Sequence, residues 1–267
     1  MSPSKTRPTR VVSPDPLAPP LVDTLLPPGH LFRGRIHVVP RARSTQDLAR
    51  LSKQIPSVWA AEIQSAGRGR HGRPWISDGP SGLWCSVLWE PLQPQFPLLA
   101  LLGSLAAADA VQALTGLSPT LKWPNDLLWK NQKLAGVLVE TVARPARLPL
   151  AILGLGLNLT QRTSDFPRGL QKTAVSLQRA SGRIVPRAQM LAAFLDSLAH
   201  RLTQPPAEVL EDFRAAWGHQ GRTLSVRSGG QTWCGVAEQI DAAGHLHLRL
   251  ADGSTKVWVS GEVDFPA

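Results

Sequence analysis

The stretch Glu62–Ser77 reads EIQSAGRGRHGRPWIS and holds three arginines among three glycines within seven residues. Glycine loses more backbone entropy on ordering than any other residue, and arginine is rarely buried without a partner, so a folding core gains nothing from this composition. The runs VWAAEI (residues 58–63) and LWCSVLW (residues 83–89) on either side are typical of β-strands. We therefore expect a loop between two strands, with arginines that face an anion.

Strand-like and helix-like runs alternate along the chain around this loop. The strand-like runs are rich in Val, Ile, Leu and Trp, which suits a mixed, well-buried sheet. The longest helical run, residues 98–114, is apolar, but Asp109 and Gln112 interrupt it, so it predicts a buried helix rather than a membrane span. We expect strands over residues 35–39, 58–63, 83–89, 121–129, 133–141 and 150–159, and helices over residues 44–51, 98–114, 187–202 and 207–217.

The sequence pattern changes from Gly221 onward. Leucines alternate with polar residues in LHLRL (residues 246–250), and turn-forming pairs fall at Ala243-Gly244 and Asp252-Gly253. This pattern predicts a small β-barrel of under 50 residues, too small to be very stable alone and expected to dock on the main domain. We therefore expect an α+β protein, with a main domain of mixed sheet and flanking helices over residues 31–219 and a β-barrel over residues 220–267.

The first 30 residues differ from the rest, because they hold eight prolines. The chain has a formal net charge of +10, and residues 1–43 supply +5 of it through seven Lys or Arg and two Asp. This composition predicts a disordered leader over residues 1–30, either a solubilising tail or a basic arm for nucleic acid or an acidic partner. We recognise no secretion signal, and two cysteines without paired spacing fit a reducing cytoplasm.

Several common active-site motifs are incomplete or missing in the sequence. Residues 67–72 have the glycine spacing of a Walker phosphate loop, but Arg73-Pro74 stands where Lys and Ser or Thr are required. GLGLN (residues 154–158) lacks the third glycine of a dinucleotide fingerprint, the seven histidines are scattered, and no G-x-S-x-G elbow occurs. What remains is a set of cations, one amide and one carboxylate that suits charge neutralisation around phosphates. Its members are Arg68, Arg70, Arg73, Lys122, Asn125, Asp126 and Lys133.

Five motifs follow one another along the chain in an order that is specific to one family. They are STQD (residues 44–47), AEIQSAGRGRHGRPW (61–75), KWPND (122–126), KLAGVLVE (133–140) and GLGLN (154–158). On these motifs the chain resembles biotin protein ligases from about residue 35 to residue 263. The resemblance implies a class II synthetase-like catalytic domain followed by an SH3-like β-barrel. It also implies a two-step reaction, in which ATP with Mg²⁺ converts biotin to biotinyl-5'-AMP and a lysine of a biotin carboxyl carrier domain then displaces AMP.

The resemblance further implies roles for individual side chains. The loop arginines Arg68 and Arg70 would close over the adenylate, and Lys133 would reach the junction of carboxylate and phosphate. The implied catalytic set is Arg70, Lys133, Asp126 and Lys122, with Asp126 as the Mg²⁺ contact. The implied biotin-binding set is Ser44, Thr45, Gln46, Gln64, Gly67, Arg68, Arg70, Lys133 and Gly136. The implied nucleotide-binding set is Arg68, Arg70, Arg73, Trp75, Asn125, Lys133 and Asn158.

Simple structural roles stay open for several of these residues. Ser44 suits a helix cap, and Asp126 suits a turn after Pro124-Asn125. Trp75 and Trp123 suit packing more than chemistry.

Gln46 departs from the family, which usually has Asn at this position, so the contact with biotin or the start of the helix stays open there. The first 30 residues are too few for the winged-helix repressor domain of many bacterial relatives, so we expect a ligase without specific DNA binding. The expected acceptor is the biotin carboxyl carrier domain of acetyl-CoA carboxylase or another biotin-dependent carboxylase, in the cytoplasm and away from membranes. A homodimer and a monomer are both open. The alternative functions are a lipoate or octanoate ligase or transferase and, from another class, a nucleic-acid-binding module.

Overall fold

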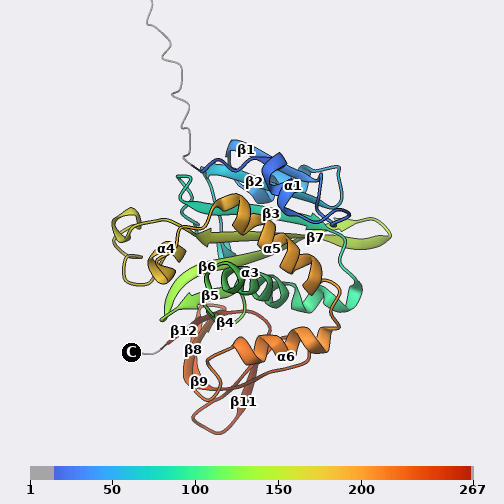
Figure 1. The fold of residues 1–267 in the computed structure, drawn as a ribbon. Coiled ribbons are helices and arrows are strands. Elements are labelled where there is room, and N and C mark those ends of the chain that lie inside the picture. The colour runs from blue at the N-terminus through green and yellow to red at the C-terminus, as the bar shows by residue number, and fades with distance from the viewer. Residues whose placement is uncertain (1–14, 266–267) are drawn as a thin grey trace, which may run out of the picture.

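The computed structural model describes residues 15–265, which fold into a seven-stranded mixed sheet with flanking helices and a five-stranded antiparallel sheet (Figure 1). The main sheet has the strand order β1-β2-β3-β7-β6-β5-β4, in which β1 runs parallel to β2 and all other neighbours are antiparallel. Its strands are β1 (Ile36–Ala42), β2 (Ser57–Gln64), β3 (Gly82–Trp89), β4 (Thr120–Lys122), β5 (Asp126–Trp129), β6 (Gln132–Arg144) and β7 (Arg147–Asn158). The predicted α+β class is confirmed.

Helices cover one face of the main sheet (Figure 1). The long helix α3 (Leu99–Thr115) packs against β6, β7 and α5 (Arg187–Arg201). Gly103 lets α3 approach the sheet closely, since a Cβ there would lie 2.4 Å from Leu153 Cδ1. The segment Gln95–Thr115 is long and apolar enough to cross a membrane, but 72% of its apolar window is buried inside the fold. It is the core helix of the domain, as predicted.

The opposite face of the sheet is only partly covered. The short helix α2 (Thr45–Leu51) packs there against β2, β3 and β7, over a small core that includes Leu88 and Ile152. Beside α2 this face carries small residues, because Ser86 pairs with Gly154 and Gly136 pairs with Gly156 across neighbouring strands. We call this region, bounded by those four residues, the open face. The missing side chains leave room above the sheet for a ligand.

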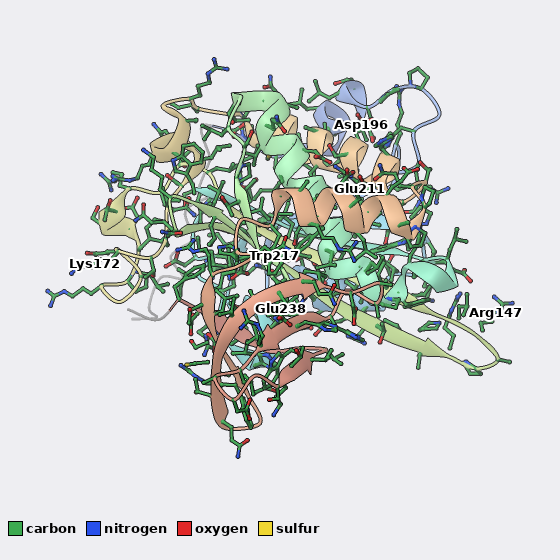
Figure 2. All side chains as sticks on the ribbon, turned by 90° about the horizontal axis from the view of Figure 1, so that it is seen from below. Arg147, Lys172, Asp196, Glu211, Trp217 and Glu238 are labelled. Carbon is green, nitrogen blue, oxygen red and sulfur yellow. The ribbon has the colours of Figure 1, made fainter. Side chains whose placement is uncertain are left out.

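The C-terminal domain is the second sheet, with strand order β11-β10-β9-β8-β12. Its strands are β8 (Thr223–Ser228), β9 (Gln231–Ile240), β10 (Leu246–Arg249), β11 (Thr255–Trp258) and β12 (Glu262–Asp264). The helix α6 (Pro206–Ala216) leads into it, and Trp217 is buried between that helix and the sheet (Figure 2). The domain docks on the main domain through the Trp123 indole, whose Nε1 donates to Gly244 O at 2.8 Å. Trp123 is therefore a packing residue, as its structural interpretation predicted.

The prediction of disorder up to residue 30 is wrong for the described residues 15–30. Helix α1 (Pro19–Leu25) packs on α5, and Val22 and Leu26 enter the main core. The buried Arg187 also donates its backbone N–H to Asp15 Oδ2 at 2.7 Å and thus ties down the start of the segment. The prediction of disorder depended on the proline content. Pro19 and Pro20, however, stand in the first turn of a helix, where proline is tolerated. Residues 1–14 lie outside the described part of the chain.

The remaining elements are short and connect the larger ones. They are α4 (Leu177–Ser181) and the 3-10 turns η1 (Arg70–Gly72), η2 (Gln93–Leu98) and η3 (Thr163–Asp165). The β6–β7 hairpin projects from the body of the protein with Arg147 near its tip (Figure 2).

Candidate functional site

A cavity of about 650 Å³ lies above the open face. Its floor is the open face itself, and its walls come from α2, from residues 68–76, from the β4–β5 turn and from residues 261–265 of the C-terminal domain. All of the sequence motifs that define the family resemblance therefore meet around one cavity. The C-terminal wall was not predicted from the sequence.

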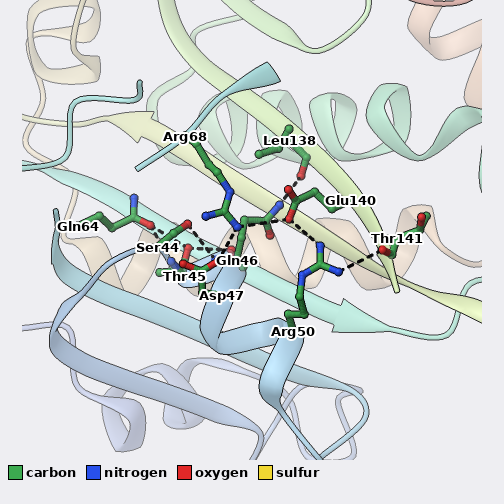
Figure 3. Close-up of polar contacts among 11 residues, drawn as sticks. Ser44, Thr45, Gln46, Asp47, Arg50, Gln64, Arg68, Leu138, Glu140 and Thr141 are labelled. Atoms are coloured by element: carbon green, nitrogen blue, oxygen red, sulfur yellow. Dashed lines mark hydrogen bonds and ion pairs between the residues drawn. The ribbon is translucent and has the colours of Figure 1, made fainter. Parts of the chain in front are cut away.

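One end of the cavity carries a chain of hydrogen bonds among neutral polar residues, of which Figure 3 shows Thr45 and Gln64. Gln64 Oε1 accepts from the Thr45 backbone N–H at 2.8 Å, and its Nε2 donates to Ser77 Oγ at 3.1 Å. The Thr45 hydroxyl lies 2.7 Å from Ser86 Oγ. These buried groups hold one another in fixed orientations, which suits recognition of a compact neutral ring. Ser86 was not predicted, although a single serine within the apolar run LWCSVLW is a usable signal.

Ser44 and Gln46 begin helix α2 beside this end. Ser44 is the N-cap, and its Oγ accepts from the Gln46 backbone N–H at 3.3 Å, so the capping role is confirmed. The Gln46 side chain is buried above Gly154, and its Nε2 donates to Leu138 O at 3.3 Å (Figure 3). Gln46 Oε1 has no hydrogen-bond partner within the described residues. Gln46 is longer than the asparagine that is usual in the family. Its side chain therefore reaches from α2 to β6, while Ser44 still caps the helix.

The floor of the cavity is closed by an aromatic ring that packs directly on glycine. A Cβ on Gly156 would lie 2.4 Å from Trp75 Cε2, so only glycine allows the indole to sit there. Lys133 Nζ lies 5.3 Å from the Trp75 ring centroid, and Gly136 leaves space for both side chains. Gly67 has a similar role, because a Cβ there would lie 2.6 Å from Trp75 O. Gly67 and Gly136, which were predicted to bind ligand, therefore allow Trp75 to lie close to the backbone.

The loop of residues 67–73, which we call the Arg loop, is the lid-like wall of the cavity. Its first arginine, Arg68, points to α2 and β6, where it pairs with Asp47 at 2.6 Å and with Glu140 at 3.7 Å (Figure 3). The hydrogen bond from Arg68 lowers the pKa of the Asp47 carboxyl. Arg50 also pairs with Glu140 at 3.1 Å. Two carboxylates thus match the Arg68 charge, so its side chain anchors the loop to the sheet.

Arg70 lies in a different electrostatic setting. Its Nη1 donates to Asn125 Oδ1 at 3.2 Å and to Gly261 O at 3.1 Å, and both acceptors are neutral. Within the described residues, Arg70 forms no ion pair with a carboxylate. Burial lowers the pKa of its guanidinium, and the more distant Asp126 and Glu262 offset this only in part. Arg70 is therefore a half-buried cation that has no carboxylate partner among the described residues, which is the arrangement expected at an anion site.

The other predicted cations line the same cavity with carboxylate partners. Lys133 Nζ pairs with Asp126 Oδ1 at 2.7 Å, and Lys122 Nζ lies 3.5 Å from Asp264 Oδ1. Arg73 forms a two-fold contact with Glu262.

Two predicted amides serve the fold directly. Asn125 Nδ2 donates to Val137 O at 2.6 Å, which leaves its oxygen for Arg70. The buried Asn158 donates to Val175 O at 3.3 Å and accepts from Gln161 at 3.4 Å. Asn158 therefore holds the end of β7 against the following segment.

Comparison with known proteins agrees with this architecture. Residues 38–158 match the model of the Biotin/lipoate A/B protein ligase family, and residues 219–265 match that of the Biotin protein ligase C terminal domain. The chain is 35% identical over 217 residues to the biotin--[acetyl-CoA-carboxylase] ligase of Mycobacterium tuberculosis, covering 77% of each chain. It is 31% identical over 222 residues to the bifunctional ligase/repressor BirA of Bacillus spizizenii, covering 81% of this chain and 68% of that protein.

A solved structure shows the same fold. The biotin protein ligase of Aquifex aeolicus in complex with biotin and ATP superimposes with a TM-score of 0.75 at 24% identity, covering 86% of this chain and 97% of the other. The family resemblance inferred from the five motifs is thus confirmed by independent comparisons of sequence and fold. The chain belongs to the biotin protein ligase family.

Proposed function

We propose that this protein joins biotin to AMP, using ATP, and then transfers biotin to a lysine of a biotin carboxyl carrier domain. The observation that carries the proposal is Arg70, a half-buried cation held by two neutral oxygens at the wall of a cavity whose other end is a neutral polar pocket. Biotinyl-AMP has the matching chemistry, since a neutral bicyclic ring is joined by an acyl chain to an anionic phosphate. Membership of the family and the names of the relatives support the same substrates.

The first step needs positive charge, because the carboxylate of biotin must approach a triphosphate of about −4. Each pair of unit charges 4 Å apart repels by about 1 kcal/mol in water and by several times more in a partly buried site. Arg70, Lys133 and Lys122 converge on the cavity and would offset this repulsion. The carboxylate oxygen then bonds to the α-phosphorus and pyrophosphate leaves. We assign the phosphate-side contacts to these three cations, while Arg73 is held by Glu262.

The ring end of the cavity supports recognition of the ureido group. Thr45 and Gln64 present a fixed hydroxyl and a fixed amide to the cavity, and the unpartnered Gln46 Oε1 lies beside them. A ureido ring has two N–H donors and one carbonyl acceptor, so it can use acceptors and donors of this kind. The Trp75 ring, next to Lys133, gives the nucleotide base or acyl chain an apolar surface.

Asp126 fits a role in holding Mg²⁺ together with the nucleotide. Its carboxylate lines the cavity beside Lys133, and no group of three or more metal-binding side chains occurs within the described residues. Mg²⁺ is usually bound by one or two carboxylates together with substrate phosphates and water, so a single protein carboxylate is sufficient. Bound there, Mg²⁺ would neutralise part of the triphosphate charge.

In the second step the amine of the acceptor lysine attacks the acyl carbon, AMP leaves with the bridging oxygen, and the amine loses a proton. We expect the acceptor to be the carrier domain of acetyl-CoA carboxylase, since acetyl-CoA carboxylase is the substrate in the name of the Mycobacterium tuberculosis relative. We expect the enzyme to act in the cytoplasm without specific DNA binding. Its catalytic domain includes α1 and so begins before the predicted residue 31, and the C-terminal domain keeps the predicted start at residue 220. Biotinyl-AMP is a mixed acid anhydride and must be protected from water until this acceptor binds. The Arg loop would provide this protection.

Biotin-dependent exchange of labelled pyrophosphate into ATP tests the first step without any acceptor. We expect exchange with biotin and little exchange with lipoate or octanoate, since the family match and the ring-end polar groups both favour biotin. If lipoate supports pyrophosphate exchange as strongly as biotin does, the lipoate alternative would replace this proposal. Absence of exchange with any acid would remove both.

A further inference from the structure

The C-terminal strand β12 and Gly261, the residue before it, contact the Arg loop through two arginines. Arg70 donates to Gly261 O at 3.1 Å, and Arg73 donates through its two terminal guanidinium nitrogens to both carboxylate oxygens of Glu262. Arg73 and Glu262 lie 189 residues apart in the sequence. The C-terminal domain therefore supplies the outer support of a loop that belongs to the catalytic domain.

The conformation of the Arg loop depends on such outside support. His71 has a φ of 56° and Gly72 a φ of 72°, so the chain turns through the left-handed region between Arg70 and Arg73. A non-glycine residue in this region is strained and persists only where its surroundings hold it. Within the loop, Gly69 N donates to Arg73 O at 2.7 Å. The contacts of Arg70 with Gly261 and of Arg73 with Glu262 add restraints on the outer side.

We propose that Glu262 is a positioning residue of the ligase reaction: by holding Arg73 it keeps the Arg loop, and with it Arg70, closed over the bound adenylate. This inference rests on the proposed function. Glu262 does not touch the reacting atoms in this account and acts through Arg73. The consequence is that the C-terminal domain controls how long biotinyl-AMP is retained.

Glu262 is suited to this role because its carboxylate lies closer to Arg73 than to any other cation among the described residues. Its carboxylate is 25% exposed and its other cationic neighbour, Arg227 of β8, lies farther away at 3.8 Å. A two-fold Arg–carboxylate contact fixes direction as well as distance, which a single point contact does not. A similar acidic residue of the same domain, Glu238 (Figure 2), pairs with Arg249 at 2.9 Å and does not contact the Arg loop. Glu238 therefore provides a matched control.

The test measures how fast preformed biotinyl-AMP leaves the full-length enzyme. Each variant is loaded with labelled biotin, ATP and Mg²⁺, pyrophosphate and free nucleotide are removed, and release is followed in excess unlabelled biotin. We expect Glu262→Gln to accelerate release by about two- to fivefold, the range that a partly exposed ion pair supplies. We expect Glu238→Gln to behave as wild type. Labelling of lysines on a bystander protein should rise in step with release.

A double-mutant cycle shows whether Glu262 acts through Arg73. In an Arg73→Gln background, Glu262→Gln should add nothing to the release rate, because its partner is already gone. Additive effects of the two substitutions, or release by Glu262→Gln at the wild-type rate, would overturn the inference. Faster release together with a lowered melting temperature in Glu262→Gln but full additivity would assign Glu262 to general stability and would also overturn it.

The proposed function and this inference fail in different ways. Biotin-dependent pyrophosphate release by the wild-type enzyme establishes that the adenylate forms, whatever Glu262 does. If that release is absent in wild type, the ligase proposal itself fails. If release occurs and the adenylate leaves both enzymes at the same rate, only the role of Glu262 fails. A tighter apparent affinity for ATP in Glu262→Gln with unchanged adenylate release would make the carboxylate a competitor of the triphosphate for Arg73, against the inference.

Discussion

Replacing Arg70 by Gln should separate function from stability in this enzyme. The guanidinium is held by Asn125 Oδ1 at 3.2 Å and Gly261 O at 3.1 Å, and a bound phosphate would give it its missing counter-charge. A hydrogen bond to a charged group contributes about 1.5–3 kcal/mol, and its loss should speed release of biotinyl-AMP by about 10- to 100-fold. Adenylate formation should fall less than retention does, because Lys133 and Lys122 remain.

The stability of the same variant should change little. Burial lowers the pKa of Arg70, which means that the empty fold disfavours its charge, while its hydrogen bonds to Asn125 and Gly261 act in the opposite direction. We expect the melting temperature of Arg70→Gln without ligands to stay close to that of wild type.

The assay for Arg70→Gln combines adenylate release with labelling of lysines on a bystander protein such as serum albumin. The matched variant Arg70→Lys keeps the charge but loses the planar fork, so it should fall between wild type and Arg70→Gln. Wild-type retention by Arg70→Gln would refute the reasoning, since Arg70 would then have no role in holding the phosphate. A clear drop in melting temperature would also refute it, because the residue would be acting as structural support.

Three other residues give independent predictions. Burial and two neighbouring cations lower the pKa of His219 to about 4, so this group stabilises the fold above its unfolded pKa of 6.5 and loses about 3 kcal/mol as pH falls from 6.5 to below 4. Replacing His219 by Gln should flatten the unfolding free energy across that window in chemical denaturation, and an unchanged slope would contradict the assignment. Replacing Asp126 by Asn should raise the Mg²⁺ concentration for half-maximal pyrophosphate release by about tenfold, and an unaltered Mg²⁺ titration would exclude it as a metal contact. Replacing Gly156 by Ala places a methyl 2.4 Å from the Trp75 ring and should weaken ATP binding in calorimetry, while Gly169→Ala, which meets open space, should not.

The main sheet could be predicted from local pattern, and the residues around the cavity from five motifs that the chain shares with one family. Alternating apolar runs set the strands, and the glycines at Gly136 and Gly156 mark places where a neighbouring ring comes close to the sheet. The interpretation of Ser44 as a cap and of Trp123 as a packing residue also followed from their local context.

Other features depend on contacts between distant segments, which a local pattern does not encode. The proline content of residues 1–30 predicts disorder, but the few apolar residues of α1 that reach α5 are enough to fold it onto the domain. The sequence placed Arg68, Arg70 and Arg73 in one group, yet their partners differ: two carboxylates for Arg68, neutral oxygens for Arg70, and Glu262 of the C-terminal domain for Arg73. Only the folded structure shows that carboxylates hold Arg68, whereas Arg70 has no carboxylate partner among the described residues.

Transfer of biotin to the lysine of a carrier domain is the reaction that the proposed function requires. The full-length protein is incubated with biotin, ATP, Mg²⁺ and a purified biotin carboxyl carrier domain, and the acceptor is examined by mass spectrometry alongside its Lys→Arg form. We predict one biotin on the acceptor lysine, with pyrophosphate and AMP released in equal amounts, and no product with lipoate. An unmodified acceptor without biotin-dependent pyrophosphate release would contradict the account.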